Sequence, residues 1–166
     1  LVSVGTSSVS VFGTRADGSS WRAGLRDPQG GPTSVAGVVE LPVGGMASLS
    51  TSGDNLGPLG VLAPEVVVRA AGSASDHHAR ETSRETAAGG GRVFDHHIID
   101  PRTGYPANAG VRQVSVVASS GVLAEALSTA LLVDPSIDVP DVVACWARET
   151  GAPASARVVS LVRVGS

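Results

Sequence analysis

The stretch Phe-Asp-His-His-Ile-Ile-Asp-Pro-Arg-Thr-Gly occupies residues 94–104. Phe94, Ile98 and Ile99 predict a short buried strand, and residues 100–104 predict the turn that ends it. Histidines and a carboxylate at the end of a strand lie where a rigid sheet can aim them into a cleft. We therefore expect part of a catalytic site in this segment.

Residues 119–133 predict a helix. Glu125 and Thr129 lie four residues apart in it, so they share one face of the helix. A buried carboxylate needs a partner, and oxygen ligands suit a hard cation such as magnesium. The remaining surface is mostly apolar, which predicts a largely buried helix. The apolar positions are Val122, Leu123, Ala126, Leu127, Ala130 and Leu131.

Length and charge limit the class of protein. The chain has 166 residues, enough for one domain with a sizeable core. Its net charge of -3 and its lack of an arginine stripe interleaved with aromatics argue against nucleic-acid binding. A single cysteine, Cys145, excludes an internal disulfide, and we expect it to be an unreactive core thiol. No apolar run is long enough to predict a membrane-spanning helix.

Alternating apolar and polar residues predict an α+β fold. The expected architecture is an antiparallel strand meander with two helices of the C-terminal half packed on the sheet. The second helix begins after Asp138, a capping residue, and ends at Gly151. Strands are predicted at residues 2–4, 7–12, 21–25, 35–41, 46–50, 111–118 and 156–164.

Two segments between these elements read as loops. Residues 51–55, Thr-Ser-Gly-Asp-Asn, predict a turn whose backbone N-H groups can face an anionic ligand, although an ordinary polar turn has the same composition. Residues 56–92 are rich in small and charged residues, and we expect them to form an inserted, mobile surface loop within a single domain that spans residues 1–166.

The histidines come as two Asp-His-His triplets, at residues 76–78 and 95–97. A class of manganese-dependent phosphoesterases carries such a triplet, but it needs further aspartate motifs that this sequence lacks. Only one of His96 and His97 can face a cleft if both lie in a strand, and a structural histidine is the plain alternative. Combined with the hydroxyl-rich turn and the Glu125–Thr129 pair, the second triplet favours a site for a metal-bound phosphate ester with a histidine as proton acceptor.

Four segments resemble one family. Residues 97–104, His-Ile-Ile-Asp-Pro-Arg-Thr-Gly, resemble the signature of the FAD:protein FMN transferase family, also called ApbE or thiamine-biosynthesis lipoproteins. Residues 50–54 resemble its Thr-Ser-Gly-Asp segment, residues 124–130 its metal-binding helix and residues 21–28 its Trp-Arg strand. The matches occur in family order and together span most of the chain.

This resemblance implies a reaction and a set of residue roles. The family transfers FMN from FAD to a threonine or serine hydroxyl of an acceptor protein and releases AMP, with magnesium as cofactor; some relatives hydrolyse FAD instead. By position, the resemblance makes His97 the catalytic base and Glu125 and Thr129 the metal ligands. The cofactor-binding positions are Thr51, Ser52, Gly53 and Asp100.

Three departures from the family pattern accompany the resemblance. The family helix carries aspartate where this chain has Glu125, a side chain longer by one carbon-carbon bond, about 1.5 Å. Gly5 is followed by Thr6-Ser7-Ser8 rather than by a second glycine. The family also has a preceding section that supplies much of the flavin pocket, so we expect that section, or a second chain, to complete the site.

Two further expectations follow from the resemblance. A family-type lipoprotein leader would lie before Leu1, which would indicate a bacterial cell-envelope protein, with the cytoplasm as the alternative. A second class of function stays open: a non-catalytic flavin-binding module that kept the fold while its metal site changed.

Overall fold

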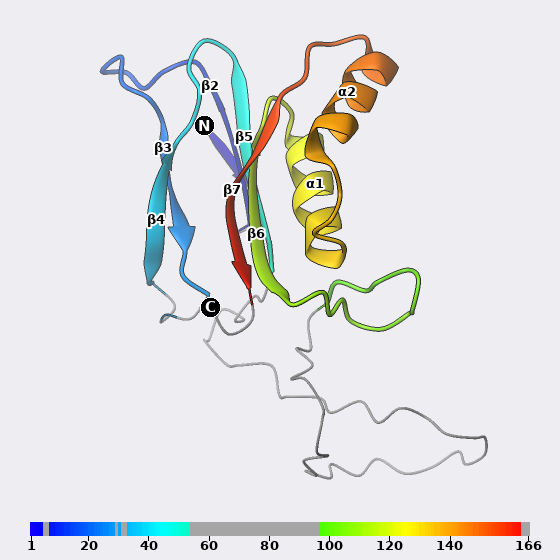
Figure 1. The fold of residues 1–166 in the computed structure, drawn as a ribbon. Helices are drawn as coiled ribbons and strands as arrows, with labels where there is room; N and C mark the ends of the chain where they lie inside the picture. The colour runs from blue at the N-terminus through cyan, green and yellow to red at the C-terminus, as the bar shows by residue number, and fades with distance from the viewer. Residues whose placement is uncertain (5–6, 29, 31–32, 54–96, 164–166) are drawn as a thin grey trace, which may run out of the picture.

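A computed structural model of the chain describes residues 1–4, 7–28, 30, 33–53 and 97–163. It has three layers: a two-stranded sheet, a five-stranded antiparallel sheet and a pair of helices (Figure 1). The α+β class with two helices in the C-terminal half is therefore confirmed. The expected strand at Phe94, the first Asp-His-His triplet and the expected loop at residues 56–92 lie outside the described residues.

The five-stranded sheet has the order β1-β2-β5-β6-β7, and β3 pairs with β4 in the smaller sheet. The predicted bounds of most elements are confirmed to within two residues. The strands are β1 (Val2–Val4), β2 (Ser8–Phe12), β3 (Arg22–Arg26), β4 (Val35–Glu40), β5 (Met46–Gly53), β6 (Val111–Ala118) and β7 (Ala156–Arg163), and the helices are α1 (Gly121–Val133) and α2 (Val139–Thr150).

The predicted meander is wrong in its connectivity. Residues 15–18 form a turn between β2 and β3, but β2 pairs with β5 and not with β3. The β3–β4 hairpin instead packs on one face of the larger sheet, where Leu25 and Leu41 are buried with Leu49. Burying these leucines requires face-to-face packing, which a continuous single sheet would not provide.

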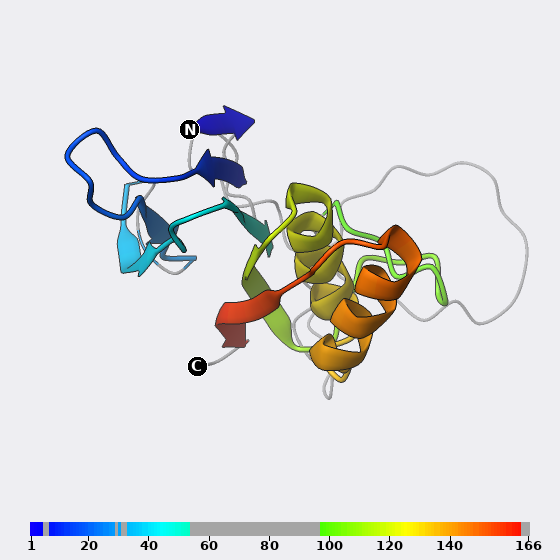
Figure 2. The ribbon, with the colours of Figure 1, turned by 90° about the horizontal axis from the view of Figure 1, so that it is seen from above.

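Helix α1 covers the opposite face of the sheet, beside α2 (Figure 2). Leu123, Leu127 and Leu131 are buried against Val114 and Val116 of β6. The prediction of a largely buried helix is wrong for the outward side, where Val122 is 66% exposed. Apolar residues all around a helix predict burial on every side, but the described residues cover only the sheet side and the α2 side of α1.

Strand β5 is longer than predicted and includes Thr51, Ser52 and Gly53, which were expected in a turn. The extension is possible because β6 pairs with it to the end, as far as Gly53 opposite Gln113. A Cβ atom on Gly53 would lie 2.5 Å from the carbonyl oxygen of Arg112, so the two strands approach closely here. Asp54 and Asn55 lie outside the described residues.

Helix α2 has the predicted caps. The carboxylate of Asp138 accepts a hydrogen bond from the amide of Asp141, and Gly151 ends the helix with a φ of 67°. None of its residues is fully buried, because it touches the core through the half-buried Val142, Val143 and Trp146. The prediction that Cys145 is a core thiol is therefore wrong: Cys145 is exposed.

Residues 98–107 form a small hairpin rather than the predicted buried strand. The turn at residues 100–104 is confirmed, with the amides of Thr103 and Gly104 donating to the carbonyl of Asp100. Ile99, however, forms an isolated bridge with Pro106 and is 48% exposed. The reason is that, within the described part of the chain, this segment belongs to neither sheet. Among the described helices, none has the length and apolar character needed to cross a membrane.

Candidate functional site

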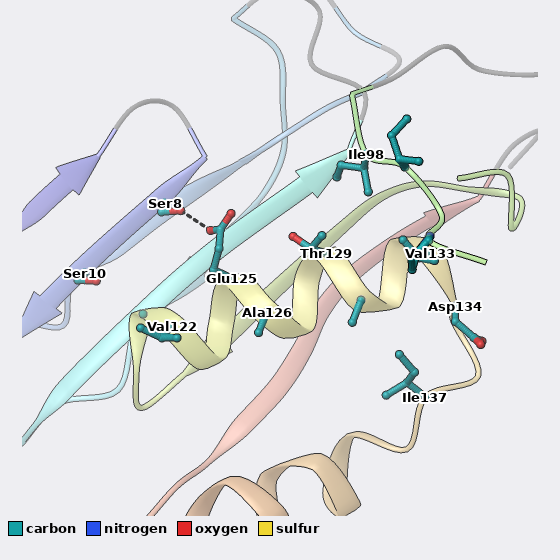
Figure 3. A pocket seen from close by; sticks show the side chains of 14 residues that line it. Ser8, Ser10, Ile98, Val122, Glu125, Ala126, Thr129, Val133, Asp134 and Ile137 are labelled. Carbon is teal, nitrogen blue, oxygen red and sulfur yellow. Dashed lines mark hydrogen bonds between the residues drawn. The ribbon is translucent and has the colours of Figure 1, made fainter. Parts of the chain in front are cut away.

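A cavity of about 960 Å³ lies between the 98–107 hairpin, the outward side of α1 and the edge of β2 (Figure 3). Most of its surface is apolar, and its oxygen atoms come from a few polar side chains. The apolar lining includes Ile98, Ile99, Val122, Ala126 and Ile137, and the oxygen-bearing side chains are Ser8, Ser10, Glu125, Thr129 and Asp134. An apolar pocket with a few convergent polar groups is typical of a small-molecule site.

Glu125 and Thr129 extend from the same side of α1 toward the strands, as predicted from their spacing (Figure 3). The expectation that this carboxylate is buried is wrong, since Glu125 is exposed. It nevertheless has partners: its Oε2 accepts hydrogen bonds from the hydroxyls of Ser8, at 2.8 Å, and Ser50. An exposed side chain is thereby held to two strands of the sheet.

Thr129 belongs to the same network of hydroxyl groups. Its Oγ1 lies 3.0 Å from Oγ of Ser52, which lies 2.9 Å from Oγ of Ser128. Ser128 is fully buried, and its hydroxyl donates to the carbonyl oxygen of Glu125 at 3.1 Å. A continuous chain of hydrogen bonds therefore joins Thr129 to Glu125 beneath the cavity.

Ser8, Ser50 and Ser128 also belong to this site, and none of the three was predicted as a site residue from the sequence. A signal was present for β5, because Ser48, Ser50 and Ser52 alternate with other residues and so point to one face of a strand. Serines on the buried face of a strand require polar partners, and the polar face of α1 supplies them. No pattern in the sequence placed Ser8 beside them.

The other predicted site residues lie apart from Glu125 and Thr129. The Thr51 side chain is on the opposite face of β5, where its hydroxyl lies 2.9 Å from that of Ser115. Gly53 packs against β6, and the carboxylate of Asp100 is bound by Arg102. His97 is exposed and is not among the residues that line the cavity. The structure thus brings together Glu125, Thr129 and Ser52 alone among the predicted set.

Comparisons with known proteins identify the family. A family model described as the ApbE family matches residues 71–154, about half of the chain. The chain belongs to the ApbE family. A search of curated proteins gives no match.

The solved structure of the ApbE protein from Thermotoga maritima is similar to this ApbE-family chain. The two share 27% sequence identity with a TM-score of 0.49, over 96% of this chain and 40% of the other. The chain therefore spans less than half the length of that relative.

An ion-pair cluster ties the 98–107 hairpin of this ApbE-family chain to the end of α1. The guanidinium of Arg102 contacts Asp100 and Asp134, each at 3.1 Å. Hydrogen bonds from Arg102 hold the pKa of the Asp100 carboxyl below its ordinary range, and the hydroxyl of Ser136, with Arg102 adding to it, does the same for the pKa of Asp134. The pKa of Arg102 is raised in turn.

Among the described residues, the cavity offers magnesium few protein ligands. The described residues contain no group of three or more histidine, cysteine or acidic side chains that could hold a metal ion. Glu125 and Thr129 offer a carboxylate oxygen and a hydroxyl oxygen at the edge of an open cavity. Magnesium commonly binds one or two carboxylates and completes its coordination with water and substrate phosphates. Glu125 and Thr129 of this ApbE-family chain could hold the ion on that basis.

Proposed function

We propose that this chain is part of a magnesium-dependent flavin transferase that moves FMN from FAD to a threonine or serine hydroxyl of an acceptor protein and releases AMP. The observation that carries the proposal is the pairing of Glu125 with Thr129 at an apolar cavity, in a chain of the ApbE family. The acceptor flavoprotein is the expected partner, and FAD is the expected substrate.

Glu125 and Thr129 are proposed to hold the cation. When bound, magnesium would neutralise negative charge on the FAD pyrophosphate. The apolar lining from Ile98, Val122 and Ala126 suits a flat ring system, because it can cover the rings and exclude water from them. These roles account for both the polar and the apolar part of the cavity.

His97 is proposed as the base that accepts the proton of the acceptor hydroxyl. It precedes Ile98, which lines the cavity, and its own side chain is open to solvent. Histidine is the side chain that enzymes use most often as a general base. We expect the bound substrate and acceptor to bring the hydroxyl to His97.

One observation supports a second candidate, a flavin-binding module without catalysis. Oε2 of Glu125 already accepts two serine hydroxyls, so the carboxylate has partners without a cation. FAD hydrolysis to FMN and AMP is a third outcome, in which water replaces the acceptor hydroxyl.

The deciding experiment measures AMP release from FAD, with magnesium and with a chelator, in the presence and absence of a threonine-containing acceptor. Magnesium-dependent AMP with flavin on the acceptor supports the transferase. AMP without flavin transfer indicates hydrolysis, and FAD binding with no AMP under any condition indicates the binding module.

His97→Ala tests the base. We expect AMP release to fall by about 10²–10⁴-fold while FAD binding persists. Cys145→Ser, an exposed position on α2, is the matched control and should leave turnover unchanged. Unchanged turnover in His97→Ala would refute this role.

A further inference from the structure

Four serines surround Glu125 and Thr129, two of the oxygen-bearing side chains that line the cavity. Ser8 of β2 and Ser50 of β5 contact the carboxylate of Glu125, and Ser128 of α1 and Ser52 of β5 connect the carbonyl of Glu125 to Thr129. We define these four as the serine network. Ser50, Ser52 and Ser128 are buried, so their protons must find acceptors inside the protein.

The first part of the serine network fixes Glu125. Ser8 and Ser50 both donate to Oε2, and they come from different strands, so the carboxylate is held from two directions. A carboxylate oxygen can only accept, which sets the direction of both bonds. Among the described residues, no hydrogen bond reaches Oε1. That oxygen is the one left to a ligand.

The second part of the serine network sets the direction of the Thr129 hydroxyl. Each hydroxyl has a single proton. By distance alone, the Ser52–Ser128 and Ser52–Thr129 contacts could each run in either direction. With the Ser128 proton donated to the carbonyl of Glu125, the consistent assignment has Ser52 donating to Ser128 and Thr129 donating to Ser52. Reversing this chain would leave the carbonyl of Glu125 without the Ser128 proton.

From this geometry we infer that the serine network is a positioning device. It turns the protons of Ser8, Ser50, Ser52 and Thr129 into the protein and presents two acceptor oxygens, Oε1 of Glu125 and Oγ1 of Thr129, to the cavity. Two fixed acceptors favour a cation over an anion. The inference rests on the cation role of Glu125 and Thr129 in the proposed function, and it adds the residues that prepare them.

The test measures binding of Mg²⁺ alone to the full chain by isothermal titration calorimetry, without FAD. Ser8→Ala is the main variant, because Ser8 is only half-buried and the fold should tolerate its loss. Residues that orient metal ligands typically change affinity by 10–100-fold, so we expect Mg²⁺ to bind at least about 10-fold more weakly. Ser52→Ala, which removes the acceptor of the Thr129 proton, should weaken binding similarly.

Ser10→Ala is the matched control. Ser10 lies on the same strand as Ser8, but its hydroxyl contacts Ser48 at 2.8 Å and not Glu125. Its loss should leave Mg²⁺ affinity unchanged. In a Glu125→Gln background, Ser8→Ala should have no additional effect, since the two act through one carboxylate.

The outcomes separate this inference from the proposed function. Weaker Mg²⁺ binding in Ser8→Ala but not in Ser10→Ala supports the inference, even if the wild type releases no AMP and the proposed function fails. Equal Mg²⁺ affinity in wild type and Ser8→Ala, or no Mg²⁺ binding by the wild type, overturns it. Magnesium-dependent AMP release that Ser8→Ala does not change would leave the proposed function standing and the inference overturned.

Discussion

The two sides of α1 contact the same sheet by different means. Toward β6, Leu123, Leu127 and Leu131 bury apolar surface against valines. Toward β2 and β5, Glu125 and Thr129 make hydrogen bonds to serines. Apolar burial is non-directional and mainly provides stability, whereas hydrogen bonds depend on angle and mainly fix orientation. The apolar side of α1 therefore mainly stabilises the fold, and its polar side mainly orients the site residues.

The largest expected effect comes from breaking the apolar side. Leu127→Ala removes a side chain that is 1% exposed and should lower the free energy of unfolding by about 2–5 kcal/mol. Urea unfolding measures the change. Val122→Ala in the same helix is the control, because Val122 is exposed and the change should stay within about 0.5 kcal/mol. Equal losses of unfolding free energy in Leu127→Ala and Val122→Ala would contradict the conclusion that the buried apolar side of α1 stabilises the fold.

Breaking the polar side should cost less stability. Ser128→Ala removes the buried acceptor of the Ser52 proton, and leaving a buried donor unpaired costs about 1–3 kcal/mol. The same urea experiment applies, with the exposed Ser155→Ala as control. A loss as large as that of Leu127→Ala would show that the polar side also carries the fold.

Thr129→Val sharpens the comparison, because it keeps the shape of the side chain and removes only the hydroxyl. Ser52 can still donate to Ser128, so we expect the free energy of unfolding to change by no more than about 0.5–1.5 kcal/mol. Mg²⁺ affinity, measured by calorimetry, should nevertheless fall. Full Mg²⁺ affinity in a folded Thr129→Val protein would remove Thr129 from the site.

The element pattern of the described residues could be predicted from sequence because it is local. The periodicity of residues 111–118 and the Asp138 and Gly151 caps needed no information from elsewhere in the chain. The spacing of Glu125 and Thr129 was equally local, since residues four apart on a helix share a face.

Pairings between distant segments could not be predicted in this way. Ser8 and Glu125 are separated by 117 positions, and their contact depends on β2 lying beside β5 while β3 and β4 leave the sheet. The prediction that Cys145 is buried was wrong for a related reason. An apolar helix pattern predicts burial, but the neighbouring elements decide how deeply α2 packs.

The smallest expected effect concerns the 98–107 hairpin, which lies beyond the end of α1 and belongs to neither its apolar nor its polar side. The folded state lowers the pKa of Asp100 and Asp134, so their ionised forms add stability above the ordinary value of about 3.9 and lose it as pH falls through the lowered values. Between pH 5 and 8 the hairpin should therefore stay attached, and below about pH 4 it should loosen.

Hydrogen exchange at the amides of Gly104 and Ala107, which are bonded within the hairpin, measures this. The Arg102 side chain, which both ion pairs share, is exposed to solvent, so the increase in exchange at low pH should be small. Arg102→Gln should weaken or remove this increase in exchange at low pH. The exchange of core amides of β6 should not change with pH in this range. If hydrogen exchange in Arg102→Gln depends on pH as it does in the wild type, a group other than these ion pairs causes the change.

The close approach at Gly53 limits which mutations this gene can accept. Every single-nucleotide change that replaces glycine introduces a Cβ atom, and here that atom would lie 2.5 Å from a carbonyl oxygen and 2.8 Å from the Cα atom of Gln113. Both neighbours are backbone, so a strand would have to move, and the adjacent Ser52 would move with it. A position with no side chain should therefore be among the least mutable in this domain.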